Sequence, residues 1–178
     1  MIYIALLRGI NVGGNKMVPM ADLRATIEGL AFTNVKTLLQ SGNVVFEGKS
    51  VKPVVLEKRL EDEIARRLGV QCDLHVRTAD EWSAVVDGNP FAAEARTDPG
   101  HLLVTFYREP LDAARVAAFQ RSIAGPERLR ADGRHLYMTF PDGVGRSKAA
   151  VSMDKMLGTK GTARNWNTVT KLAALAGG

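Results

Sequence analysis

The order of apolar runs and amphipathic segments in the first 77 residues is the feature that most constrains the fold. Short runs rich in apolar residues predict strands, and apolar residues that recur at steps of three and four predict helices. The predicted elements are strand 2–7, helix 19–30, strands 35–40 and 43–47, helix 53–68 and strand 72–77. This order is typical of a ferredoxin-like βαββαβ unit.

The second half of the chain repeats this order but lacks a predicted fourth strand. Its expected elements are strand 101–107, helix 112–123, strands 127–130 and 135–140, and helices 148–157 and 163–176. We therefore expect an α+β fold with two ferredoxin-like halves, the second incomplete and closed by two C-terminal helices. Turn residues at Asn89-Pro90 place the boundary between domains 1–89, which ends in a linker helix, and 90–178, which ends in a basic helical tail.

The composition is that of an ordinary globular protein. The chain has 178 residues, of which 46% are hydrophobic and 24% charged, and its single cysteine, Cys72, excludes a disulfide scaffold. The first apolar run is too short for a signal peptide or a membrane span, so we expect a cytoplasmic protein with no membrane partner.

The positive charge is concentrated near the C-terminus. The formal net charge is +5, and the segment from Gly143 onward carries six basic residues and one acid, whereas the preceding residues balance. An excess of one sign in one segment predicts an anionic partner, either a phosphate-bearing small molecule or nucleic acid, with nucleic acid the leading hypothesis. A solvated basic face is the alternative interpretation.

A glycine-rich loop follows the first predicted strand and leads to a helix. Arg8, Asn11 and Lys16 lie in or beside this loop and could bind phosphate or carboxylate near the helix N-terminus. The spacing fits neither a P-loop nor the dinucleotide-binding pattern G-x-G-x-x-G. A connection that merely needs positive φ angles is equally compatible with these glycines.

Ser41 and Asn43 flank the predicted hairpin turn. If the first two strands are parallel, they end at the same edge of the sheet, and the glycine-rich loop and this turn become neighbours. The combined residues, Arg8, Asn11, Lys16, Ser41 and Asn43, would then line the site of an enzyme acting on a small phosphorylated or carboxylated substrate. A purely structural turn is the simpler interpretation.

The basic tail contains two further candidate anion sites. Ser147 is a predicted N-cap with Arg146 and Lys148 beside it, and such a helix start favours an anion. Thr162 is the predicted N-cap of the last helix, where Arg164 and Asn167 share a polar face while Trp166 faces the core.

Familiar catalytic patterns are missing from the sequence. The three histidines lack metal-ligand spacing, and no nucleophile or zinc-hydrolase motif is present. We expect no metal and no cofactor, and the sequence leaves open whether the protein is an enzyme.

Four segments together carry a resemblance to a known family. They are 6–14 (LLRGINVGG), 39–46 (LQSGNVVF), 140–148 (FPDGVGRSK) and 164–168 (RNWNT). In this order they resemble the bacterial family of unknown function DUF1697. The resemblance implies an α+β protein with ferredoxin-like subdomains, and it implies no activity and no catalytic residues.

Overall fold

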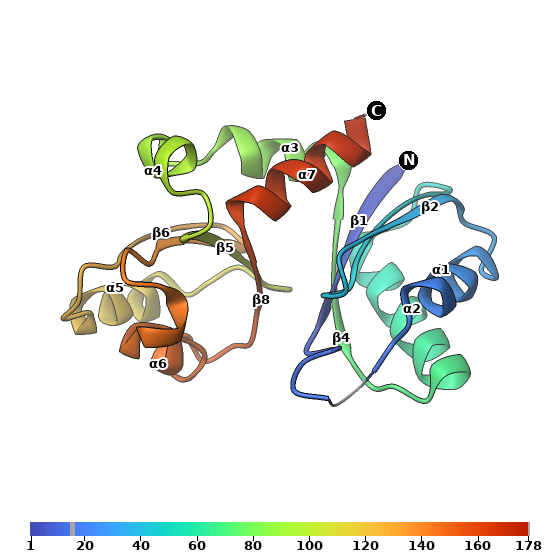
Figure 1. Cartoon of the computed structure of the whole chain (residues 1–178), viewed down its shortest axis with the longest axis horizontal. Helices are drawn as coiled ribbons and strands as arrows, with labels where there is room; N and C mark the ends of the chain where they lie inside the picture. Colours follow the sequence, from blue (N-terminus) through green and yellow to red (C-terminus); the bar gives the residue numbers. More distant parts are fainter. Residues whose placement is uncertain (15–16, 178) are drawn as a thin grey trace. The chain divides into compact units, whose positions relative to one another are not determined.

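The protein forms two compact units, seen here in a computed structural model that describes residues 1–14 and 17–177 (Figure 1). The first unit comprises Met1–Ala84 together with the segment from Lys171 onward, and the second comprises Val85–Thr170. The boundary predicted between residues 89 and 90 stays a prediction. No helix in the described ranges has the length and apolar character needed to cross a membrane.

The first unit has the predicted βαββαβ order. Its elements are β1 (Ile2–Arg8), α1 (Met20–Glu28), β2 (Thr33–Leu38), β3 (Asn43–Glu47), α2 (Pro53–Leu68) and β4 (Asp73–Thr78), followed by α3 (Ala79–Asp87). The sheet has the order β2-β3-β1-β4, with antiparallel neighbours throughout. Strands β1 and β2 are each antiparallel to β3, so they are parallel to each other and end at the same edge of the sheet.

Both helices pack on one face of this sheet (Figure 1). Tyr3, Ala5 and Leu7 alternate along β1 and share one buried cluster with Leu23 of α1 and Leu60 of α2. Period-two and helical apolar patterns therefore meet in one core, as the sequence predicts.

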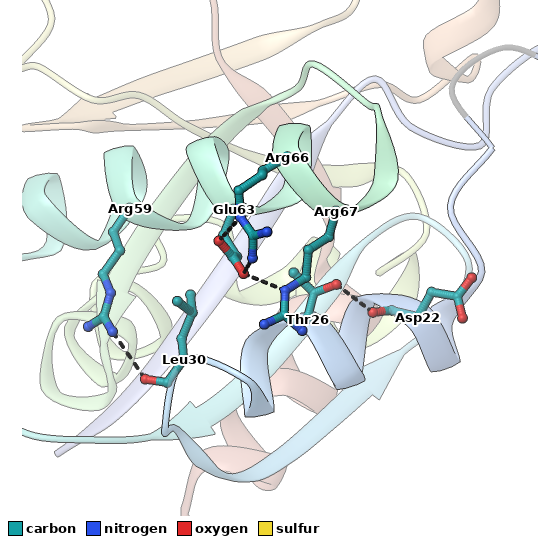
Figure 2. Close-up of polar contacts among 7 residues, drawn as sticks. All are labelled: Asp22, Thr26, Leu30, Arg59, Glu63, Arg66 and Arg67. Atoms are coloured by element: carbon teal, nitrogen blue, oxygen red, sulfur yellow. Dashed lines mark hydrogen bonds and ion pairs between the residues drawn. The ribbon is translucent and has the colours of Figure 1, made fainter.

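Arginines of α2 face the end of α1, as Figure 2 shows. Arg59 donates to the carbonyl of Leu30 at 3.1 Å, which satisfies a backbone acceptor just beyond the helix. Arg66 and Arg67 both donate to the carboxylate of Glu63, with 2.9 Å between Arg66 Nε and Glu63 Oε2. Of these contacts, the one from Arg59 joins α2 to the residue beyond α1, and those to Glu63 lie within α2.

The second unit has the same order of elements. They are β5 (Leu102–Phe106), α5 (Ala113–Ser122), β6 (Arg128–Asp132), β7 (His135–Thr139), the short 3₁₀ helix η1 (Val144–Arg146), α6 (Lys148–Leu157) and β8 (Thr162–Asn165). Helix α4 (Ala92–Thr97) precedes them and α7 (Trp166–Gly177) follows. The sheet order is β6-β7-β5-β8, and Phe119, Leu136, Met138 and Leu157 belong to one buried cluster of this unit.

The expected α+β class with two ferredoxin-like halves is confirmed, but the second half is not incomplete, because β8 supplies the fourth strand of its sheet. The helix predicted over 163–176 is wrong at its first residues, because Thr162–Asn165 form strand β8, in which Arg164 pairs with Val104 of β5. Burial alternates along this segment, and the helical apolar pattern begins only at Trp166. The N-cap is accordingly Asn165, whose Oδ1 accepts from the Thr168 amide at 3.0 Å, and not the predicted Thr162.

Candidate functional site

A cavity of about 540 Å³ lies in the second unit, where the α5–β6 connection meets the start of α6. One wall is the segment 122–127. The other wall consists of Asp142, Arg146, Ser147, Lys148, Ala149 and Ser152. Polar and charged side chains of both signs therefore surround a space large enough for a small ligand.

The turn after β7 brings the second wall into place. Gly143 has φ of +85°, a conformation that favours glycine, and its amide donates to the Phe140 carbonyl at 2.8 Å. Ser147 then caps α6, because its Oγ accepts from the Ala150 amide at 3.2 Å. The chain thus turns from a buried strand into a helix whose first residues, Lys148 and Ala149, line the cavity.

Ser147 also connects the two walls. Its hydroxyl donates to Oε1 of Glu127, twenty residues earlier in the chain. Ser147 is only 6% exposed, and this contact is partly buried. The pair fixes the segment before β6 against the start of α6.

Arg146 and Lys148 supply the positive charge of the cavity. Both are exposed, and neither forms an ion pair with any residue in the described part of the chain. The carboxylates of Asp142 and Glu127 also line the cavity, but the Ser147 hydroxyl already binds Glu127. The start of α6 adds the partial positive charge of a helix N-terminus.

The structure places the other two tail candidates outside this cavity. Arg164 lies in β8 and is 9% exposed; its Nη1 donates to Thr162 Oγ1 and to the Ala163 carbonyl, each at 2.8 Å. Burial lowers the pKa of its guanidinium to about 10, so the group stays protonated near neutral pH. Asn167 is exposed in the first turn of α7. The helical face that Arg164 and Asn167 were predicted to share does not exist, because Arg164 belongs to a strand.

The glycine-rich loop and the Ser41 turn are neighbours, as their shared sheet edge predicts. The Asn11 amide nitrogen donates to the carbonyls of Val18 at 3.0 Å and Gln40 at 2.7 Å, and its Oδ1 accepts from the Val18 amide at 2.7 Å. The Leu7 amide donates to the Gly42 carbonyl at 2.8 Å. The hydrogen-bonding groups of Asn11 therefore connect the loop to the turn.

Asn43 stabilises the same turn from inside. It is fully buried, and its Nδ2 donates to the Leu38 carbonyl at 2.7 Å and to Ser41 Oγ at 3.0 Å. The predicted site residue Lys16 lies outside the described residues.

Arg8 lies at the end of β1, beside a different hollow. It pairs with Asp73 of β4 at 3.7 Å and lines a space of about 410 Å³ with Lys58, Asp62 and Cys72 among its neighbours. Arg8 and Arg146 therefore belong to different hollows in different units.

Sequence reasoning missed Glu127 and Asp142. Glu127 follows a Gly-Pro pair and was assigned to the start of a strand, and no spacing rule connects it with Ser147. Asp142 lies in the quoted segment before η1, where a turn explains it equally well. No group of three or more metal-ligating side chains occurs among residues 1–14 and 17–177.

Comparison with known proteins identifies the family. The model of a family described as proteins of unknown function, DUF1697, matches residues 1–137. The chain belongs to this family. The matched region of this DUF1697 protein ends at residue 137, so the whole second cavity wall, which begins at Asp142, lies beyond it.

The fold of this DUF1697 protein is similar to that of a solved structure. It is described as the conserved bacterial protein SP0830 from Streptococcus pneumoniae, with a TM-score of 0.75, 24% sequence identity and coverage of 98% of each chain. At this identity the similarity shows the fold alone. No curated protein matches the chain.

Proposed function

We propose that this DUF1697 protein binds a small phosphate-bearing ligand in the cavity between the α5–β6 connection and α6. The observation that carries the proposal is the pair of exposed cations, Arg146 and Lys148, on either side of the Ser147 N-cap, at the rim of a cavity of about 540 Å³. Volumes of this order are typical of small-molecule sites.

The chemistry of the wall suits a phosphate group. The guanidinium of Arg146 can donate two parallel hydrogen bonds to phosphate oxygens, and the ammonium of Lys148 acts as a point charge. Amides at a helix start add donors that need no side-chain ordering. The Glu127 carboxylate repels an anion. The hydrogen bond that it accepts from Ser147 weakens this repulsion but does not remove it.

Nucleic acid, the leading hypothesis from sequence, is also a phosphate-bearing ligand, but it presents many phosphates along its backbone. It would need a track of several cations, but Arg164 is buried in β8 and donates hydrogen bonds to Thr162 and Ala163 of that strand. Salt dependence separates the two versions. Neutralising about six phosphates lowers affinity by about 10³ between 50 and 200 mM salt, whereas one or two contacts lower it about tenfold or less.

Calorimetric titration with inorganic phosphate, adenosine monophosphate and a sugar phosphate tests the proposal. We expect Arg146→Ala and Lys148→Ala each to weaken binding about tenfold, because each removes a charge-assisted contact. Lys155→Ala is the matched control, since Lys155 is exposed in the last turn of the same helix. Equal affinity of all four proteins, or no binding by any of them, would contradict the proposal.

Glu127→Gln provides a test of opposite sign. The amide oxygen of glutamine can still accept from Ser147, but the negative charge is lost. We therefore expect this variant to bind phosphate several-fold more tightly than the wild type.

The alternative enzyme site at the glycine-rich loop stays a prediction. No observation favours it over the cavity, because Asn11 and Asn43 use their amides to hold the loop and the turn.

A further inference from the structure

Both edge strands of the first unit are shielded. A bulge interrupts β2 between Thr33 and Lys36, and such an irregularity disfavours pairing of its outer edge with another strand. Along β4, alternate amides point away from β1 and donate to carboxylates of α2 and α3. These bonds run from Leu74 to Glu61 at 2.7 Å, from Val76 to Glu57 at 2.9 Å and from Thr78 to Glu81 at 2.9 Å.

The two edges of the second unit differ from each other. On β8 the Arg164 guanidinium covers the Ala163 carbonyl. On the opposite edge, β6 pairs with β7 in one continuous register from Arg128↔Thr139 to Asp132↔His135, with neither a bulge nor a proline. The usual interruptions of an edge strand are therefore missing from β6.

The open backbone groups of β6 belong to Leu129 and Ala131. Asp132 and His135 flank a two-residue turn and form a hydrogen-bonded pair, so by alternation Arg128 and Arg130 also face β7. The N–H and C=O groups of Leu129 and Ala131 point the other way. In the described part of the chain no other group bonds to them.

There is room beside this strand on both faces of the sheet. A hollow of about 550 Å³ is lined by Leu129 and Ala131 of β6 and by Val116 and Gln120 of α5. A second hollow of about 360 Å³ lies between β6 and the segment that contains Gly88 and Pro90. Phe91 and Glu94 contact the strand at its first residue, Arg128, whereas Leu129 and Ala131 border hollows.

The charges on β6 indicate which strand fits this edge. Arg130 and Asp132 lie on the same face of the strand, and neither forms an ion pair within the described ranges. If a second β6 runs antiparallel with Ala131 opposite Ala131, each Arg130 lies opposite the partner's Asp132. The register centred on Arg130 would instead place two arginines opposite each other, and the Arg128 that it sets opposite Asp132 already pairs with Glu94.

We propose that β6 pairs with β6 of a second copy of this chain, antiparallel and centred on Ala131. The two Ala131 residues exchange both of their backbone hydrogen bonds, and two equivalent Arg130–Asp132 pairs flank them. The contact is isologous, so it closes as a dimer and does not propagate. A five-residue strand is small against the usual size of a stable interface, and the dimer forms reversibly at high protein concentration.

Sedimentation equilibrium of the whole chain from about 10 µM to about 1 mM, at low salt, is the first test. We expect a reversible monomer–dimer equilibrium, together with slower amide exchange of Leu129 and Ala131 as the concentration rises. A chain that stays monomeric throughout would overturn the proposal and leave the edge to a strand from another protein.

Ala131→Pro removes the central donor without touching the bonds to β7, and should weaken the dimer at least tenfold. Circular dichroism checks that the variant folds. A dimer of unchanged strength in this folded variant would also overturn the proposal.

Charge reversal tests the register. Arg130→Asp and Asp132→Arg should each weaken the dimer, and the double variant should restore it to within about threefold. The register centred on Arg130 predicts no such rescue, because the double variant would set two aspartates opposite each other. Arg24→Asp, the same charge change at an exposed position of α1, is the control. The β6 contact involves neither Arg146 nor Lys148, so dimerisation does not depend on phosphate binding in the cavity.

Discussion

Gly42 shows how one residue holds the junction between the glycine-rich loop and the Ser41 turn. Its φ is +76°, and an added Cβ would lie 2.6 Å from Ile10 Cδ1 and 2.8 Å from Leu7 Cβ. Gly42→Ala should therefore lower the free energy of unfolding by about 3 kcal/mol, from left-handed strain and overpacking together. Urea denaturation measures this loss.

Gly13→Ala is the matched control, because Gly13 has φ of +61° with nothing within 4 Å of the added Cβ. It should cost only the conformational part, about 1 kcal/mol. Equal losses in the two variants would contradict the close packing of Gly42 against Ile10 and Leu7.

Ionisation of Glu63 should make part of the free energy of unfolding depend on pH in the acid range. The hydrogen bond from Arg66, followed by the contact with Arg67, lowers the pKa of its carboxyl from 4.5 to about 2. A pKa that is lower in the folded state stabilises the protein above the unfolded value, and that contribution is lost as pH falls from about 4.5 through 2.

Carbon-13 titration of the Glu63 carboxyl measures this pKa directly. Arg66→Ala should raise it toward the ordinary value. Denaturation at several pH values should show a shallower acid slope in Glu63→Gln than in the wild type. A Glu63 carboxyl that titrates normally in the folded wild-type protein would refute the contact.

At the scale of elements, the start of α6 depends on its cap. Ser147→Ala removes the acceptor for the Ala150 amide and the donor to Glu127, so we expect a loss of about 1–2 kcal/mol. Ser147→Thr keeps the hydroxyl and should retain most of the stability. Chemical denaturation compares the two variants, and similar losses in both would show that the hydroxyl does not act as the cap.

Helix α6 and strand β8 show what the sequence can predict at this scale. The cap Ser147 and the apolar positions of α6 are local signals, and the predicted helix 148–157 is confirmed. Strand β8 has four residues and exists because Ala163 and Arg164 pair with β5, about sixty residues earlier. Local periodicity contains no trace of that pairing, so the strong helical pattern from Trp166 was extended too far toward the N-terminus.

The candidate site required information from the whole molecule. Arg146, Ser147 and Lys148 are adjacent in sequence and could be predicted together. Glu127 joins them only because the α5–β6 connection crosses the start of α6. The prediction for Arg164 was wrong for the converse reason. Arg164 is close to the last helix in sequence, but pairing of β8 with β5 places it in a strand and buries it.

The C-terminal turns of α7 offer a test of how the chain is divided. Residues from Lys171 onward belong to the compact unit that contains Met1–Ala84, and Leu172 is fully buried. Leu172→Ala should cost about 2–5 kcal/mol, since it leaves a cavity. Val151→Ala, at a side chain 88% exposed on α6, should be nearly neutral. Because the substitution affects the first unit, amide exchange should accelerate in β1 and β3 more than in β6 and β7. The opposite order would assign the end of α7 to the second unit.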